Sequence, residues 1–128
     1  MIADDQDLER FMRGEVAATA FPHRDHVRMG FEMLRRHDFA TCAFQYSSAL
    51  RKMLAKLGKP QAFHQTMTIA FLALIAERIE SGNWHDFDAF AAANPELFDR
   101  SVLRRWYSAE QLGSQAARDT FLLPELPR

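Results

Sequence analysis

The sequence is poor in cysteine and in net charge, and it has no low-complexity segment. Its single cysteine, Cys42, allows no internal disulfide, which favours a reducing cytosol. A net charge of −1 provides no excess of basic residues to bind nucleic acid or an anionic membrane. No repeat or linker divides the chain, so we expect residues 1–128 to form one domain.

Long apolar runs are also missing. The longest, IAFLALIA (residues 69–76), is less than half of the roughly 20 residues that a membrane-spanning helix needs. The first residues, MIADDQDLER, are acidic and have no apolar stretch of the kind found in secretory signals. There is no P-loop, dinucleotide fingerprint, nucleophile elbow or C-x-x-C motif. These absences indicate a soluble cytoplasmic protein. No motif indicates a reaction that it catalyses.

Apolar residues recur at helical spacing, and no segment alternates with the period of a strand. The spacing predicts a short helix capped by Asp4 or Asp5, and three longer helices over about 22–37, 38–57 and 62–81. The last of these is apolar around most of its circumference, so we expect it to be the central helix. The predicted fold is all-α: a bundle of about four antiparallel helices over residues 4–82, capped by short C-terminal helices and an extended tail over 84–128.

Two histidines begin the second predicted helix, in the stretch AFPHRDHVRMGFEML (residues 20–34). At 100° per residue, His23 and His26 fall on the same stripe as Val27 and Leu34. The opposite side of the helix is charged and is expected to face solvent; it carries Arg24, Asp25, Arg28, Glu32, Arg35 and Arg36. Both imidazoles are therefore predicted to point toward the core.

His64 falls on the apolar stripe of the fourth predicted helix in the same way, opposite Thr66, Glu77 and Glu80. The connections between the second, third and fourth helices are short, so we expect these helices to be antiparallel neighbours. The second and fourth would then begin at the same end of the bundle. This arrangement predicts that His23, His26 and His64 converge.

A cluster of three imidazoles suggests a site for a divalent transition metal, Zn, Fe, Ni or Cu. Three protein ligands with an open fourth position are typical of catalytic zinc. Without metal, the same histidines could form a pocket for a small polar ligand or act as a general acid or base. Thr68, Tyr107 and Glu110 are candidates for the remaining contacts. The alternative is a non-catalytic interaction protein whose histidines only organise the core; the oligomeric state is open.

Other side chains are expected to have structural roles. Tyr46 is predicted to be a core residue distant from the histidines, and Arg78 to form a buried ion pair or to extend its stem toward solvent. His37 is expected at the C-terminal end of its helix, and His85 on the surface. Cys42 is predicted to be a buried, inert thiol.

Three segments resemble an uncharacterised family of small bacterial proteins. They are F-x-H-x-D-H-V at 21–27, KLGKPQAFHQTMT at 56–68, and FAAANPELFDRSVLRRWYSAEQLGSQAARDTFLLPEL at 90–126. The family shares an F-x-H-x-x-H-[LV] motif and a [YF]-H-x-T motif, and glutamate commonly follows the second motif's histidine, where this chain has Gln65. The resemblance implies an all-helical fold and a pairing of His23 and His26 with His64. It implies no activity.

Overall fold

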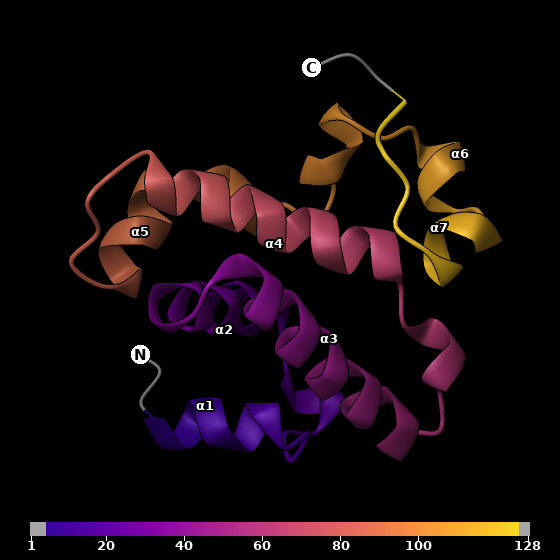
Figure 1. Ribbon diagram of the computed structural model, residues 1–128, viewed down its shortest axis with the longest axis horizontal. Helices are drawn as coiled ribbons and strands as arrows, with labels where there is room; N and C mark the ends of the chain where they lie inside the picture. Colours follow the sequence, from indigo (N-terminus) through magenta and orange to yellow (C-terminus); the bar gives the residue numbers. More distant parts are fainter. Residues whose placement is uncertain (1–4, 126–128) are drawn as a thin grey trace.

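The computed structural model describes residues 5–125 and consists of helices joined by short connections (Figure 1). The α-helices are α1 (Asp5–Met12), α2 (His23–Arg36), α3 (Phe39–Lys56), α4 (Gln65–Glu80), α5 (Phe87–Ala93), α6 (Ala109–Leu112) and α7 (Gln115–Asp119). Short 3₁₀ helices lie at Ala18–Ala20, Pro60–Ala62, Pro95–Phe98 and Val102–Arg105. Residues 5–125 contain no strand, so the predicted all-α class is confirmed. In this range no helix combines the length and apolar character that a membrane crossing requires.

The long helices begin and end close to the predicted positions. Pro22 precedes α2 and His37 follows it, while Asp38 precedes α3. At the end of α3 the chain reverses through Gly58, whose positive φ of 81° lets the Lys59 amide donate to the Leu54 carbonyl at 2.9 Å. The predicted cap at Asp4 lies outside the described residues.

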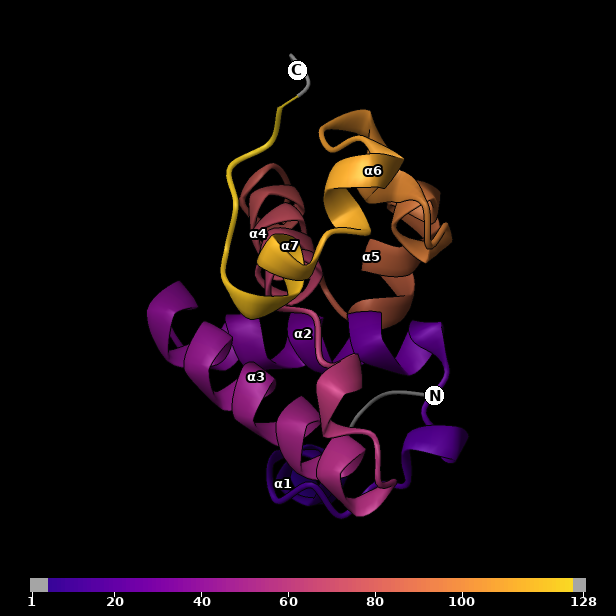
Figure 2. The same ribbon diagram turned by 90° about the vertical axis from the view of Figure 1, so that its right-hand side faces the viewer.

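The arrangement of the helices differs from the expected bundle. In Figure 1 α4 runs across the view and α2 is seen nearly along its axis, whereas in Figure 2 α2 runs across and α4 points toward the viewer. The two helices therefore cross steeply instead of lying side by side, and the predicted bundle of four antiparallel helices is not confirmed. Together α2 and α3 separate α1 from α4 and the C-terminal helices (Figures 1 and 2).

Both α2 and α4, the helix expected to be central, contribute to two hydrophobic clusters. In α2, Met29 and Met33 belong to a cluster shared with α1, α3 and α4, and Val27 and Phe31 belong to one shared with α4 and the C-terminal segment. All four side chains are at most 2% exposed. Burial on both sides explains why α2 has so few fully solvated positions.

Gly30 permits the close crossing of α2 and α4. A Cβ atom at this position would lie 3.0 Å from Ile75 Cδ1 and 3.2 Å from Leu72 Cδ2. Both neighbours are essentially fully buried, so neither can move aside into solvent. The absence of a side chain at residue 30 therefore sets how closely the two helices approach.

Two side chains assigned to the solvent face are in fact buried. Glu32 is 3% exposed because Arg36 donates to its carboxylate at 2.9 Å and Arg35 approaches it at 3.6 Å. Thr66 is fully buried because its hydroxyl lies against the C-terminal segment. In both cases a polar group faces inward because partners satisfy it there.

Three side chains outside the helix crossing were predicted to have structural roles or to lie on the surface: Arg78, His85 and Cys42. Arg78 forms an ion pair with Glu96, but neither side chain is fully buried as the prediction of a buried pair required; Arg78 also donates to Asn94 Oδ1 at 3.1 Å. His85 is exposed, as expected. Cys42 is buried, and burial raises the pKa of its thiol to about 11, with the nearby Asp38 charge adding to the shift.

Candidate ligand-binding pocket

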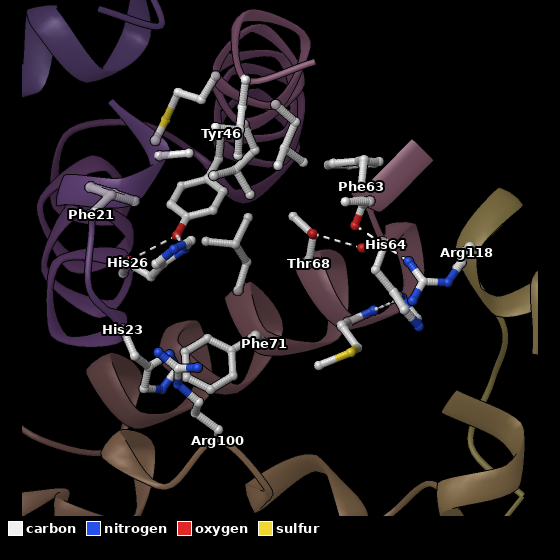
Figure 3. A pocket seen from close by; sticks show the side chains of 18 of the residues that line it. Phe21, His23, His26, Tyr46, Phe63, His64, Thr68, Phe71, Arg100 and Arg118 are labelled. Atoms are coloured by element: carbon white, nitrogen blue, oxygen red, sulfur yellow. Dashed lines mark hydrogen bonds between the residues drawn. The ribbon is translucent and has the colours of Figure 1, made fainter. Parts of the chain in front are cut away.

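A pocket of about 550 Å³ lies between α2, α3 and α4 and is closed on one side by the C-terminal segment. Its walls are largely apolar and consist of Ala18, Phe21, Leu50, Met53, Leu54, Leu57, Ala62, Phe63, Met67, Phe71, Leu72 and Leu103. Its polar lining consists of His23, His26, Tyr46, His64, Thr68, Arg100 and Arg118 (Figure 3). The volume falls within the range of about 300–1000 Å³ that is typical of small-molecule sites.

His23 and His26 lie at one end of this pocket, as their common helix face requires. His23 is the first residue of α2, and its Nε2 hydrogen bonds to the Leu97 carbonyl at 2.9 Å. Because a carbonyl only accepts, Nε2 carries the proton. The His23 ring meets the Phe71 ring edge-on at a centroid distance of 5.2 Å, and its centroid lies 6.3 Å from that of His26.

Tyr46 lies against His26, which the sequence did not predict. The Tyr46 hydroxyl donates to the His26 carbonyl at 2.9 Å, and its oxygen is 3.3 Å from His26 Nδ1. Since the phenol proton is already used, the hydrogen-bond network assigns the imidazole proton to Nδ1 and leaves a lone pair on Nε2. Burial raises the pKa of Tyr46 above its usual value, so the hydroxyl stays protonated.

The electrostatic environment keeps His26 uncharged. Its pKa is lowered from 6.5 to about 4, first by burial and then by the positive charges of His23 and Arg100. Asp99, which precedes Arg100 in the chain, does not line the pocket; its Oδ1 accepts from the Ser101 amide at 2.9 Å and hydroxyl at 2.7 Å. These hydrogen bonds, and then the interaction with His23, lower the pKa of the Asp99 carboxyl, so its negative charge offsets part of the positive charge of Arg100 at this end of the pocket.

His64 is the residue before α4 and not a member of its first turn. The turn Pro60–Ala62 delays the start of the helix, which had been expected at about residue 62. His64 Nδ1 accepts from the Met67 amide at 3.0 Å and caps the helix, while Nε2 donates to the Leu112 carbonyl at 2.7 Å. The Thr68 hydroxyl donates to the His64 carbonyl at 2.7 Å.

The three histidines line one pocket but do not converge. Figure 3 shows His64 beside Arg118, and His23 and His26 on the other side of Thr68 and Phe71. Of the residues 5–125, no three His, Cys, Asp or Glu side chains are placed so that they could hold a metal ion. The steep crossing of α2 and α4 separates the starts of these helices, and both nitrogens of His64 are already engaged. The geometry thus gives no support to the predicted metal site.

Two further predicted contacts lie elsewhere. Tyr107 belongs to the buried cluster that α4 shares with the C-terminal segment, and its hydroxyl donates to the Leu122 carbonyl at 2.8 Å. Glu110 is exposed on α6. Neither residue lines the pocket, whereas Thr68 does, as predicted. Tyr107 and Glu110 had been named as candidates for the remaining contacts of the histidine site, and this placement failed because the short, non-periodic pattern of the C-terminal segment does not indicate its path.

Two arginines supply the charge of the pocket, and sequence reasoning missed both. Arg118 Nη1 donates to the Ala62 carbonyl at 3.4 Å, at the His64 end. Arg100, beside His23 in Figure 3, makes no hydrogen bond or ion pair with any residue in the described part of the chain. The described lining residues include no Asp or Glu. Arg118 lies in the short helix α7 and Arg100 in the turn between two 3₁₀ helices, where no helical periodicity indicates which side chains face inward.

The chain matches no protein-family model, no curated protein and no solved structure. The resemblance to the small bacterial proteins with histidine motifs is therefore untested and stays a prediction.

Proposed function

We propose that this protein binds a small, largely apolar molecule in the pocket between α2, α3 and α4. The observation that carries this proposal is the pocket itself: about 550 Å³, with apolar side chains over most of its wall and a few polar groups at its ends. Filling such a volume with a hydrocarbon group removes apolar surface from water, which contributes a favourable binding free energy of about 25 cal/mol per Å² of buried surface.

In this proposal the histidines build the pocket and do not hold a metal. His23 ties the start of α2 to Leu97, and His64 ties the start of α4 to Leu112. A metal ligand needs a free lone pair on nitrogen. His64 has none, since one nitrogen donates and the other accepts. Coordination of a metal by His64 would require at least the bond from the Met67 amide to break, because that bond uses the lone pair of Nδ1.

We further propose that the protein acts in the cytosol on a small molecule and not on nucleic acid or membrane. This rests on the free, buried Cys42 and on the net charge of −1. The rival function is a non-catalytic interaction protein with structural histidines. It shares the histidine contacts but needs no ligand in the pocket.

Titration calorimetry with decanol tests the proposal, because this molecule is apolar along most of its length and uncharged. Leu50→Trp should fill the pocket and weaken decanol binding at least about tenfold, since the larger side chain occupies volume that the ligand needs. Phe44→Trp is the matched control on the same helix, because Phe44 is 74% exposed and does not line the pocket. Failure of the unmodified protein to bind decanol and other small apolar molecules would contradict the proposal.

A further inference from the structure

The charge of the pocket is one-sided, which restricts what the ligand can be. Its described lining includes two arginines and no carboxylate, although the whole chain has 17 acidic residues against 16 basic ones. A positively charged ligand would meet repulsion at both ends of this pocket. An anion would be attracted to either end.

Arg100 is the lining cation whose donors have no hydrogen-bond partner within residues 5–125. The polar side chains of His23, Tyr46, His64 and Thr68 are each bonded to a backbone carbonyl within the protein. Arg118 also donates to a carbonyl. Arg100 has no such partner in residues 5–125, and its guanidinium presents a planar fork of donors.

The start of α2 adds to the positive potential at Arg100. His23 is the first residue of α2, so the positive end of the dipole of this 14-residue helix lies at the same end of the pocket. Asp99 lies near this end and its carboxylate, which stays ionised, offsets part of this potential. It does not line the pocket, however, so Arg100 is the charged group that a ligand inside the pocket meets there.

From these observations we infer that the ligand is an amphipathic anion, whose single anionic head group binds Arg100 and whose hydrocarbon tail extends past Phe71 toward Phe63. This inference rests on the proposed function and adds the chemical class of the ligand and the place of its head group. A carboxylate fits the fork of the guanidinium with two parallel hydrogen bonds. A medium-chain fatty acid is the simplest molecule of this kind.

The test compares decanoate with decanol by titration calorimetry at low ionic strength, because the two share a chain length and differ in the head group. The unmodified protein should bind decanoate about tenfold more tightly than decanol, as expected for a charge-assisted hydrogen bond at a partly solvated site. Added salt should weaken decanoate binding and leave decanol binding unchanged.

Equal affinities for decanoate and decanol, without salt dependence, would overturn the anionic head group and leave the proposed function intact. Binding of neither molecule would overturn the proposed function itself.

Substitution of the two arginines tests where the head group lies. Arg100→Gln should weaken decanoate binding about tenfold without changing decanol binding, and Arg100→Lys should restore part of the loss. Arg118→Gln is the matched control, because it removes the same charge from the opposite end of the pocket. It should change decanoate binding less than about threefold.

A loss of decanoate affinity in Arg118→Gln as large as in Arg100→Gln, or larger, would overturn the assignment of the head group to Arg100. Circular dichroism of each variant confirms that it is folded, and Arg100 is exposed, so its removal opens no cavity.

Discussion

His64 holds two distant parts of the chain together through one side chain. Replacing it by alanine removes the cap of α4 and the bond to the Leu112 carbonyl. We expect His64→Ala to lower the free energy of unfolding by about 2 kcal/mol, about half from each interaction. Urea denaturation measures this loss. His64→Asn, which can still cap the helix, should recover about half of it; an alanine variant as stable as the unmodified protein would contradict the assigned contacts.

The environment of His26 predicts how stability depends on pH. Its folded-state pKa of about 4 lies below the ordinary 6.5, so on acidification the unfolded chain binds this proton first. The stability associated with neutral His26 is therefore present above pH 6.5 and is lost as pH falls from 6.5 toward 4, by up to about 3 kcal/mol.

Urea denaturation of the unmodified protein and of His26→Asn between about pH 7 and about pH 4 measures this contribution, because the variant lacks only the imidazole of residue 26. Asp38 and Asp99 titrate at lower pH, since hydrogen bonds from Thr41 and Ser101 respectively lower the pKa of each carboxyl below its usual range. Identical pH profiles for the two proteins would contradict the burial of a neutral His26.

At the residue scale, the sequence predicted which way the histidines face but not what they contact. Helical spacing placed His23 and His26 on the inner side of α2, and both line the pocket. Their partners could not be predicted: Leu97 lies 74 residues from His23, and Leu112 lies 48 residues from His64. Such bonds depend on the path of the C-terminal segment, which leaves no local pattern.

At the element scale, the crossing of α2 and α4 depends on Gly30. Gly30→Ala would force a methyl group against Ile75 and Leu72, which are fully packed. Overpacking of this kind costs about 1–3 kcal/mol, against a gain of up to about 1 kcal/mol from the higher helix propensity of alanine. We expect a net loss of about 1 kcal/mol in urea denaturation; a stabilised variant would mean that the helices have room to separate.

Thr66 joins α4 to the C-terminal segment. Its hydroxyl donates to the Thr120 carbonyl at 2.7 Å and accepts from the Leu122 amide at 3.1 Å. Thr66→Val leaves both backbone groups unpaired, which should cost about 2–3 kcal/mol and expose the segment after residue 120 to proteolysis. Limited proteolysis and urea denaturation measure the two effects.

Thr68→Val is the matched control for this experiment. Within residues 5–125 the Thr68 hydroxyl bonds only to the His64 carbonyl one turn earlier, so its loss should cost less than about 1 kcal/mol and leave the tail protected. Equal effects of the two substitutions would contradict the role assigned to Thr66.

The limits of sequence reasoning at this scale are visible in α4. Its period placed Thr66 among the solvent-facing residues, because the pattern cannot reveal a covering segment that arrives 54 residues later. The start of α4 was placed too early, since the turn at Pro60–Ala62 continues the apolar pattern without being part of the α-helix.

At the scale of the whole molecule, composition and period predicted the all-α class, because residues 5–125 form helices wherever apolar residues recur at helical spacing. The packing of those helices was not predictable. Short connections made antiparallel neighbours the simplest expectation, yet α2 and α4 cross where Gly30 lets them approach closely. This crossing separates His64 from His23 and His26 and leaves a pocket where a metal site had been expected.

The central claim is that this pocket holds a small molecule, and two-dimensional NMR of isotope-labelled protein titrated with decanoate tests it most directly. We predict chemical-shift changes concentrated in residues that line the pocket, such as Leu50, Thr68 and Phe71, with the exposed face around Phe44 unaffected. Changes that are absent, or that gather on the outer surface of α3 instead of the pocket, would contradict it.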